Sequence, residues 1–243
     1  MKKKAKELLF RLAAFVARDP SPKTVYYHDI GAAFTPMGTP EDLLMEHAAL
    51  LRKGDSVCFD DGFAGIFAAR QNVLAALRSK AEVTVFLAVD LVGRPGYLSW
   101  SEIRELRDSF GVDFQCHTWS HQTLAGPWND EVPVPPAGRT EQWFARELRD
   151  SKAELERRLG GPVSALCLPV GYFSQSVLER CRAAGYEKVY ASYPGNASDA
   201  FVQPRCLAQD LSPSAFRAVL EGGMNVFEKR YARMHEFPEE QVE

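Results

Sequence analysis

The sequence predicts one α/β domain whose parallel sheet is closed, or nearly closed, into a barrel. Short apolar runs rich in β-branched residues alternate with segments whose apolar residues recur at helical spacing. No long linker and no internal repeat interrupts this alternation along the 243 residues. Strands that alternate with helices are joined by crossover connections, which place the helices outside a parallel sheet.

The expected elements follow one another in a regular order. Apolar runs that end at a turn signal or a polar residue predict strands at 23–30, 56–59, 82–89, 112–116, 163–168, 188–192 and 201–207. Helical spacing, with several starts at Ser, Thr or Pro and several stops at Gly, predicts helices at 40–53, 63–79, 99–110, 140–159, 174–184 and 212–220. We therefore expect a catalytic domain at 23–225, preceded by a helical segment at 1–22 and followed by a C-terminal tail at 226–243 that is acidic and frayed from Glu236.

Composition is that of an ordinary globular protein, with 46% hydrophobic residues. The net charge of −3, from 29 basic and 32 acidic residues, gives no electrostatic basis for binding nucleic acid. The cysteine number is odd, and no pair has zinc-knuckle spacing. Four cysteines in or beside strand-like runs are predicted to be buried thiols, which suits a reducing, cytoplasmic compartment: Cys58, Cys116, Cys167 and Cys206.

The first 22 residues predict an amphipathic helix with a basic start. Its apolar face comprises Leu8, Leu12, Phe15 and Val16. The face suits packing on the domain, and it also suits a peripheral contact of residues 1–18 with an anionic membrane surface. Arg11 interrupts the apolar centre that a signal peptide needs, so an export signal would be a degenerate one and an exported form stays open.

Polar side chains of unusual type follow three predicted strands directly. His28 follows the first, Asp60 and Asp61 follow the second, and His117 precedes His121 after the fourth. The carboxyl ends of parallel strands meet at one end of a barrel, where reacting groups gather. Two adjacent aspartates repel each other, so each is expected to have a separate partner.

The two histidines of His117-Thr118-Trp119-Ser120-His121 lie four residues apart. In a helical turn they would share one face and could reach one cation. Two imidazoles and a carboxylate form a ligand set that leaves positions open for water and a substrate oxygen. The spacing therefore predicts a hydrolytic metal site.

The segments Cys58-Phe59-Asp60-Asp61-Gly62 and His117-Thr118-Trp119-Ser120-His121 resemble, in this order, the motifs of the polysaccharide deacetylases with a NodB-type domain (carbohydrate esterase family 4). The resemblance extends over nearly the whole chain, 25–220. It implies a distorted (β/α)7 barrel, a divalent metal that is often zinc, and removal of acetyl groups from N-acetylated sugars.

By the same resemblance, Asp60 is the general base, and the metal ligands are Asp61, His117 and His121. Tyr27-His28-Asp29-Ile30 looks like the Tyr-His motif of the permuted biofilm poly-N-acetylglucosamine deacetylases. It makes His28 the candidate general acid, with Asp29 as the group that would orient it. A His2Asp set favours zinc but also accepts Ni, Co or Mn.

The sequence departs from the family pattern in two places. Where many members have Arg-x-Pro-Tyr/Phe-Gly, this chain has Cys167-Leu168-Pro169-Val170-Gly171, without the arginine that holds the base. No Leu-x-His motif is found near the C-terminus. Arg205 is the candidate replacement for the missing cation, and Trp119 and Tyr172 are candidates for stacking on a sugar ring. His47 and His235 are expected to be structural or solvent-facing.

These features predict a metal-dependent hydrolase that deacetylates N-acetyl-hexosamine units of a glycan or glycan precursor. A carbohydrate-binding relative without turnover is the alternative, favoured by the missing motif arginine. A third interpretation keeps the enzyme but makes the substrate an O-acetyl ester or another amide.

Overall fold

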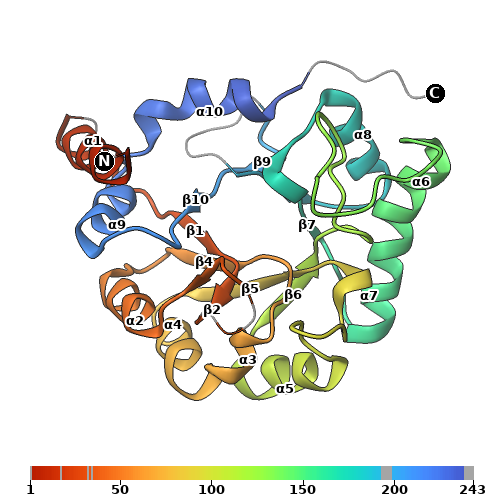
Figure 1. Cartoon of the computed structure of the whole chain (residues 1–243), viewed down its shortest axis with the longest axis horizontal. Helices are drawn as coiled ribbons and strands as arrows, with labels where there is room; N and C mark the ends of the chain where they lie inside the picture. The colour runs from red at the N-terminus through yellow and green to blue at the C-terminus, as the bar shows by residue number, and fades with distance from the viewer. Residues whose placement is uncertain (1, 17, 32, 34, 193–198, 238–243) are drawn as a thin grey trace.

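The structure is a computed structural model that describes residues 2–16, 18–31, 33, 35–192 and 199–237. Its main sheet is parallel throughout and curls in the order β10-β1-β4-β5-β6-β7-β8-β9. Figure 1 shows this sheet surrounded by helices. The strands are β1 (Thr24–Tyr27), β4 (Ser56–Phe59), β5 (Glu82–Leu87), β6 (Asp113–Cys116), β7 (Ala165–Cys167), β8 (Lys188–Tyr190), β9 (Val202–Gln203) and β10 (Cys206–Leu207). A small second sheet pairs β2 (Asp29–Ile30) with β3 (Gly38–Thr39).

The segment predicted as a single strand at 201–207 is two short strands that join the two edges of the sheet. β9 pairs with β8, and β10 pairs with β1 at the opposite edge. Only Pro204 and Arg205 separate β9 from β10. The predicted α/β barrel is thus confirmed as a curled sheet, and Arg205 lies in the short link between its two edge strands.

The helices lie outside the sheet, as the crossover pattern predicts. They are α1 (Lys2–Val16), α2 (Glu41–Leu50), α3 (Gly65–Ala68), α4 (Ala75–Arg78), α5 (Trp100–Phe110), α6 (Glu141–Ala145), α7 (Ser151–Leu159), α8 (Gln175–Ala183), α9 (Pro213–Leu220) and α10 (Glu228–His235). A π-helical turn joins α3 to α4 and another joins α6 to α7, so each of these pairs corresponds to one predicted helix. Ser99 begins α5 with a capping box, and Gly111 ends it in the left-handed conformation.

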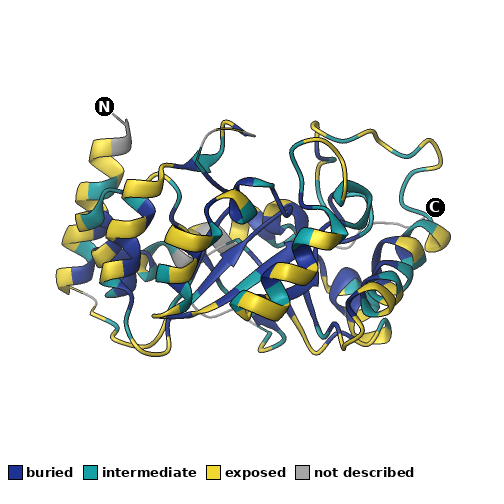
Figure 2. Ribbon diagram, turned by 90° about the horizontal axis from the view of Figure 1, so that it is seen from below, coloured by how far each residue is buried: buried dark blue, intermediate teal, exposed yellow. Residues whose placement is uncertain are grey.

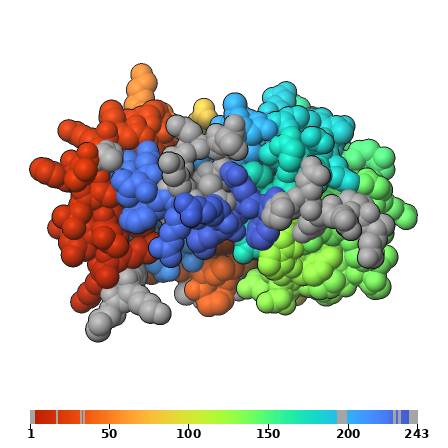
Figure 3. All heavy atoms as spheres, turned by 90° about the horizontal axis from the view of Figure 1, so that it is seen from above, coloured from red at the N-terminus to blue at the C-terminus, as the bar shows by residue number. Residues whose placement is uncertain are grey.

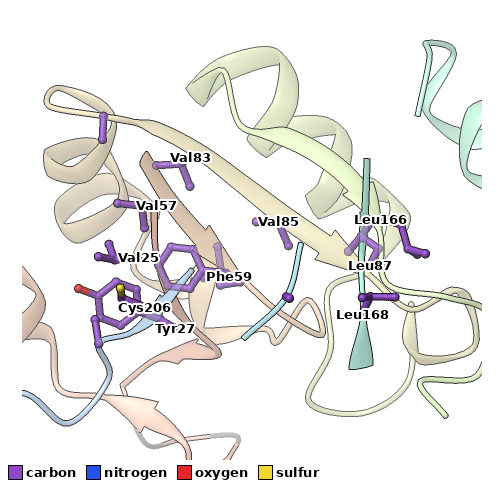
Figure 4. Close-up of a cluster of buried hydrophobic side chains, with 14 of the residues drawn as sticks. Val25, Tyr27, Val57, Phe59, Val83, Val85, Leu87, Leu166, Leu168 and Cys206 are labelled. Atoms are coloured by element: carbon purple, nitrogen blue, oxygen red, sulfur yellow. The ribbon is translucent and has the colours of Figure 1, made fainter. Parts of the chain in front are cut away.

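Alternation along the strands divides the core into two layers. Outward side chains such as Val57, Phe59 and Val85 pack under the helices (Figure 4). The inward cluster comprises Tyr26, Cys58, Phe86, Ala165 and Cys167. Buried residues follow the strands in Figure 2, whereas exposed residues lie on the helices and loops. The four cysteines predicted to be buried thiols are buried and free, as is Cys181.

Both ends of the chain differ from expectation. α1 packs on α9 through Phe10 and Ala14, whereas the apolar face expected to pack is exposed. In the segment expected to be a C-terminal tail, α10 forms before Glu236, and where fraying was expected Phe237 N donates to Phe173 O at 2.8 Å. In Figure 3 this blue segment runs across the molecule from the red N-terminal part. The end of the tail, 238–243, lies outside the described residues.

None of the helices in the described part of the chain is long and apolar enough to cross a membrane.

Candidate active site

The candidate residues gather at the carboxyl end of the strands, on strained backbone. Among the described residues, four non-glycine positions have positive φ: Asp61, Thr118, His121 and Val170. All four line, or lie in a loop at, this end of the barrel. A non-glycine residue with positive φ costs free energy, so such a cluster indicates side chains held where packing alone would not put them.

Asp61, His117 and His121 form a compact cluster of donors. Nε2 of His117 lies 3.3 Å from Asp61 Oδ1, and Nε2 of His121 lies 2.9 Å from the same oxygen. The two histidines do not lie in a helical turn as expected. They belong to an irregular loop after β6, where positive φ at Thr118 and His121 turns both rings toward Asp61.

The cluster fits a divalent cation. Nδ1 of His117 lies 2.8 Å from the Cys167 carbonyl oxygen, to which it donates. In that tautomer Nε2 has a free lone pair, which faces Asp61. Asp61 Oδ1 is buried, and in the described part of the chain the two imidazole Nε2 atoms lie beside it without forming a hydrogen bond of normal geometry. An orphaned buried carboxylate oxygen beside two imidazole nitrogens is the donor set of a metal site with open positions.

Asp61 is held in its ionised form. Burial by itself would raise the pKa of Asp61, but the positive charge of the protonated His121 imidazole beside it holds that pKa well below its usual value. A carboxylate that stays ionised is the form that ligates a metal.

Asp60 has a different partner, the guanidinium of Arg205. Asp60 Oδ1 accepts from Nη1 at 2.6 Å and Oδ2 accepts from Nη2 at 2.9 Å, in a bidentate pair with both side chains buried. Burial would raise the pKa of Asp60, but Arg205 and then His117 lower it. The two adjacent aspartates therefore have separate partners: Asp60 pairs with the Arg205 guanidinium, and Asp61 lies beside His117 and His121.

Arg205 contacts Asp60 beside Cys167, the residue at the position of the absent motif arginine. Cys167, which occupies that motif position, has its Sγ 2.9 Å from Nη2 of Arg205 and 3.6 Å from Asp60 Oδ1. The guanidinium also lies over the ring of Tyr26, 4.3 Å from its centroid. Asp60, His117 and Cys167 are a second close donor set, but the guanidinium between Asp60 and Cys167 disfavours a cation there.

His28, half-buried at the end of β1, is held by a residue that sequence reasoning missed. Its Nδ1 lies 2.7 Å from Oε1 of Gln209, which follows β10. Asp29, expected to orient His28, instead accepts from its neighbour Ile30 N at 2.8 Å. Because β10 lies beside β1 only after the sheet closes, no local pattern could reveal the contact between His28 and Gln209.

Glu147 supports the loop that carries the histidines. It is buried and accepts from the backbone N–H groups of Trp119 and Ser120 at 3.0 and 2.9 Å. Trp119 donates from Nε1 to Asp90 at 2.8 Å. Tyr172 packs against the rings of His235 and Phe237.

Two cavities adjoin the cluster and share Met37, Asp61, His121 and Glu131. One of about 670 Å³ has charged walls that include Asp90, Arg94, Arg146 and Glu147. The other, of about 400 Å³, is lined by Asp60 and His28 on one side and by Val170, Leu207, Met224 and Met234 on the other. His235 also lines it, so this buried histidine is not solvent-facing as one alternative expected. Neither Trp119 nor Tyr172 is among the described residues lining these cavities.

A curled parallel sheet with two separately held aspartates and a histidine pair at its carboxyl end is the class of α/β barrel that gathers reactive side chains at one end. Within that class, the family model for polysaccharide deacetylases matches residues 52–189. This protein therefore belongs to the polysaccharide deacetylase family, as the resemblance implied. Membership supports hydrolytic deacetylation of a polysaccharide and a glycan as substrate.

Solved structures share the fold at low sequence identity. The Streptococcus pyogenes deacetylase PplD, in complex with acetate, is 18% identical, with TM-score 0.67, over 82% of this chain and 98% of that chain. IcaB from Ammonifex degensii is 18% identical, with TM-score 0.67, over 85% and 98%. A polysaccharide deacetylase from Bacillus cereus is 21% identical, with TM-score 0.65, over 82% and 68%. No curated protein sequence gives a significant match.

Proposed function

We propose that this protein is a metal-dependent hydrolase that removes acetyl groups from N-acetyl-hexosamine units of a glycan or glycan precursor. The observation that carries the proposal is the separation of roles between adjacent aspartates. Asp61 belongs to a donor cluster with His117 and His121, and Asp60 is paired with Arg205. The first arrangement suits a cation, and the second suits a base kept ionised beside it.

Asp61, His117 and His121 would hold the cation, with zinc as the first choice and Ni, Co or Mn as alternatives. A bound divalent cation supplies a Lewis acid that acidifies water and polarises an acyl oxygen. The chain's contribution is to fix the donors. The Cys167 carbonyl orients the His117 ring, and Glu147 anchors the loop of His121 through the N–H groups of Trp119 and Ser120.

Asp60 takes a proton from the attacking water as the water oxygen bonds to the acetyl carbon. The bidentate contact with Arg205 fixes the plane of the carboxylate and keeps it ionised. Each carboxylate oxygen retains a second lone pair that can accept this proton. Arg205 is therefore a positioning residue for Asp60.

His28 donates a proton to the nitrogen that leaves as the C–N bond breaks, so the products are acetate and an amine. Nδ1–H of His28 is donated to Oε1 of Gln209, so the proton that His28 gives up is the second proton of its imidazolium form, carried on Nε2. Gln209 thus fixes which ring nitrogen gives up the proton, and is a positioning residue for His28.

The binding-only alternative rested on the missing motif arginine. The Arg205 guanidinium gives Asp60 the cation that the motif lacks, so that feature no longer favours loss of turnover. The ester alternative differs in its leaving group, because an alkoxide departs more easily than an amine and needs less help from His28.

Acetate release from oligosaccharides of N-acetylglucosamine tests the proposal directly. Metal-loaded protein should release acetate, and His28→Ala should reduce amide hydrolysis more than hydrolysis of an O-acetylated sugar. Metal-loaded protein that binds the oligosaccharide and releases no acetate from either substrate would establish the binding-only alternative instead.

A further inference from the structure

α1 is apolar on the side that faces the domain and also on the side that faces solvent. The inward side is fixed by Phe10 and Ala14, which are buried, and by Glu7, which accepts from the backbone N–H of Ser212 at 3.1 Å and from its hydroxyl at 2.8 Å. The ring of Phe10 also lies 5.9 Å from that of Phe227. These contacts set the rotation of the helix, so its outward face is defined by the fold.

The outward face is formed by large apolar side chains at helical spacing. Phe15 is 91% exposed and Val16 is 84% exposed, and Leu12 is 57% exposed. Of the eleven exposed large hydrophobic side chains in the described part of the chain, five belong to this one helix: Leu8, Leu9, Leu12, Phe15 and Val16. Figure 2 shows exposed turns along the helix that begins at the label N. A surface helix normally turns polar residues outward, so this α1 face marks a binding surface.

Basic residues flank the α1 face. On a helical projection, exposed Lys4 and Arg11 lie along one edge of it, and exposed Lys6 lies beyond the other. Glu7 is the one acidic residue in the α1 segment, and it faces Ser212. The α1 face is thus an exposed apolar stripe with basic margins and no free acid. An anionic bilayer surface is complementary to it, because apolar acyl chains lie beneath negatively charged headgroups.

We propose that the α1 face, comprising Leu8, Leu9, Leu12, Phe15 and Val16, docks the protein on the surface of a membrane that contains anionic lipid. Charge favours lipid over a second copy of the chain, because pairing two α1 faces would bring Lys4 and Arg11 of both copies together. Anionic headgroups neutralise the same charges.

Docking in this way would bring the candidate active site close to the membrane. Lys6 of α1 lines the 400 Å³ cavity together with His28, Met224 and Met234. The cavity that holds the candidate acid therefore opens beside the docking helix. The α1 face contains none of the proposed catalytic or metal-ligating residues, so the docking proposal is independent of the proposed reaction.

Vesicle co-sedimentation of the full chain tests the proposal. The probes are vesicles of phosphatidylcholine alone and vesicles of equal parts phosphatidylcholine and phosphatidylglycerol. The wild type should sediment with the phosphatidylglycerol vesicles, less so at raised ionic strength, and much less with phosphatidylcholine alone. Leu12→Glu and Phe15→Glu should each weaken binding roughly tenfold or more, since each removes a large apolar side chain from the contact.

Met45→Glu is the matched control, because Met45 is an exposed apolar residue, 44% exposed, that belongs to α2 and not to the α1 face. It should bind vesicles like the wild type. The proposal is overturned if wild type fails to bind phosphatidylglycerol vesicles, or if Met45→Glu weakens binding as much as Leu12→Glu. A wild-type dimer that ignores vesicles and that Leu12→Glu converts to a monomer would overturn it in favour of an interface between copies.

Discussion

At the scale of single residues, Asp60 and Asp61 have different partners because the backbone of Asp61 adopts a strained conformation with positive φ. Asp60 continues the inward alternation of β4 and is held by Tyr27 O, which accepts from its backbone N–H at 3.0 Å. Asp61 has φ 68° and turns toward the histidines. Gly62, also at positive φ, lies so close to Leu87 that an added Cβ would be 2.7 Å from its side chain. The glycine of the Asp-Asp-Gly segment is thus required by the turn, because a larger residue at position 62 would clash with Leu87.

This separation predicts that matched substitutions affect the bound metal differently. Asp60→Asn should lower the rate of acetate release by roughly 10²–10⁴-fold, because the base is lost, yet leave bound metal unchanged. Asp61→Asn should lower both metal content and rate, because a charged ligand is lost. Metal analysis of the two purified variants beside exposed-site Asp42→Asn checks this. If Asp60→Asn emptied the site, the assigned roles of the two aspartates would be mistaken.

A second prediction concerns the hydrogen bond between Gln209 and His28. Gln209→Ala should reduce kcat for N-acetyl substrates about tenfold and affect O-acetyl esters less, because only the amine requires protonation to leave. Gln209→Glu puts an anion beside His28 and favours the imidazolium, so the alkaline limb of the pH–rate profile for amide hydrolysis should move to higher pH. An unchanged alkaline limb in Gln209→Glu, together with equal losses on both substrates in Gln209→Ala, would refute the positioning role.

At the scale of elements, buried polar contacts fasten α2 to the strands and to α9. His47 on α2 is fully buried, lies 2.9 Å from the hydroxyl of Tyr27 on β1 and 3.0 Å from the Leu211 carbonyl, and stacks on Phe216 of α9. Burial lowers the pKa of His47 from 6.5 to about 4. The neutral imidazole is therefore the form that stabilises this junction.

Acidification should destabilise the fold through His47. Above pH 6.5 the imidazole is neutral in both the folded and the unfolded chain. Below pH 6.5 the unfolded chain binds a proton at His47, whereas the folded chain does so only near pH 4. The free energy of unfolding should fall by about 3 kcal/mol over that interval. Urea unfolding of wild type and His47→Gln at pH 7 and pH 4 checks this, since the variant lacks the titration. Burial raises the pKa of Asp29 to about 6, so protonation of Asp29 stabilises the fold as the pH falls. The effect of His47 is therefore the difference between wild type and variant in the loss of unfolding free energy. Equal pH dependence in both would contradict the assignment.

Elements that depend on local pattern could be predicted from the sequence, and those that depend on closure of the sheet could not. Alternation and helical spacing predict β4 and α5 within a residue or two. The segment 201–207 reads as one strand because its division depends on pairing with both sheet edges. α10 is strongly polar, so it has few apolar residues to distinguish it from an exposed tail.

The same distinction applies to the candidate site. The metal-type cluster could be predicted because its three members follow strands in recognisable motifs. The pairing of Asp60 with Arg205 spans 145 residues, and its sequence signal is a single charged residue inside a strand-like run. Gln209 has no signal of its own, since it contacts His28 only once β10 lies beside β1.

At the scale of the whole molecule, Arg205 connects closure of the sheet with the chemistry of Asp60. Its backbone lies between β9 and β10, and its side chain forms a buried ion pair inside the barrel. Removing one partner of a buried pair leaves an uncompensated charge. The stability of the closed sheet and the orientation of the base should therefore fail together.

Arg205→Met should lower the free energy of unfolding by about 3–5 kcal/mol and abolish acetate release. Arg205→Lys keeps the charge but loses the bidentate geometry, so it should fold more stably than Arg205→Met and still turn over more slowly than wild type. Denaturant unfolding and kcat of both variants check this. Wild-type turnover in Arg205→Lys would show that charge alone suffices, and wild-type turnover in Arg205→Met would exclude any role in positioning Asp60.

The proposed hydrolysis depends on a cation held by Asp61, His117 and His121. This dependence can be measured as acetate release from an N-acetylglucosamine oligosaccharide before chelation, after complete metal removal, and after zinc is returned. We expect release to cease on chelation and to recover with zinc, in step with the metal bound per chain. Undiminished release from metal-free protein would contradict the claim.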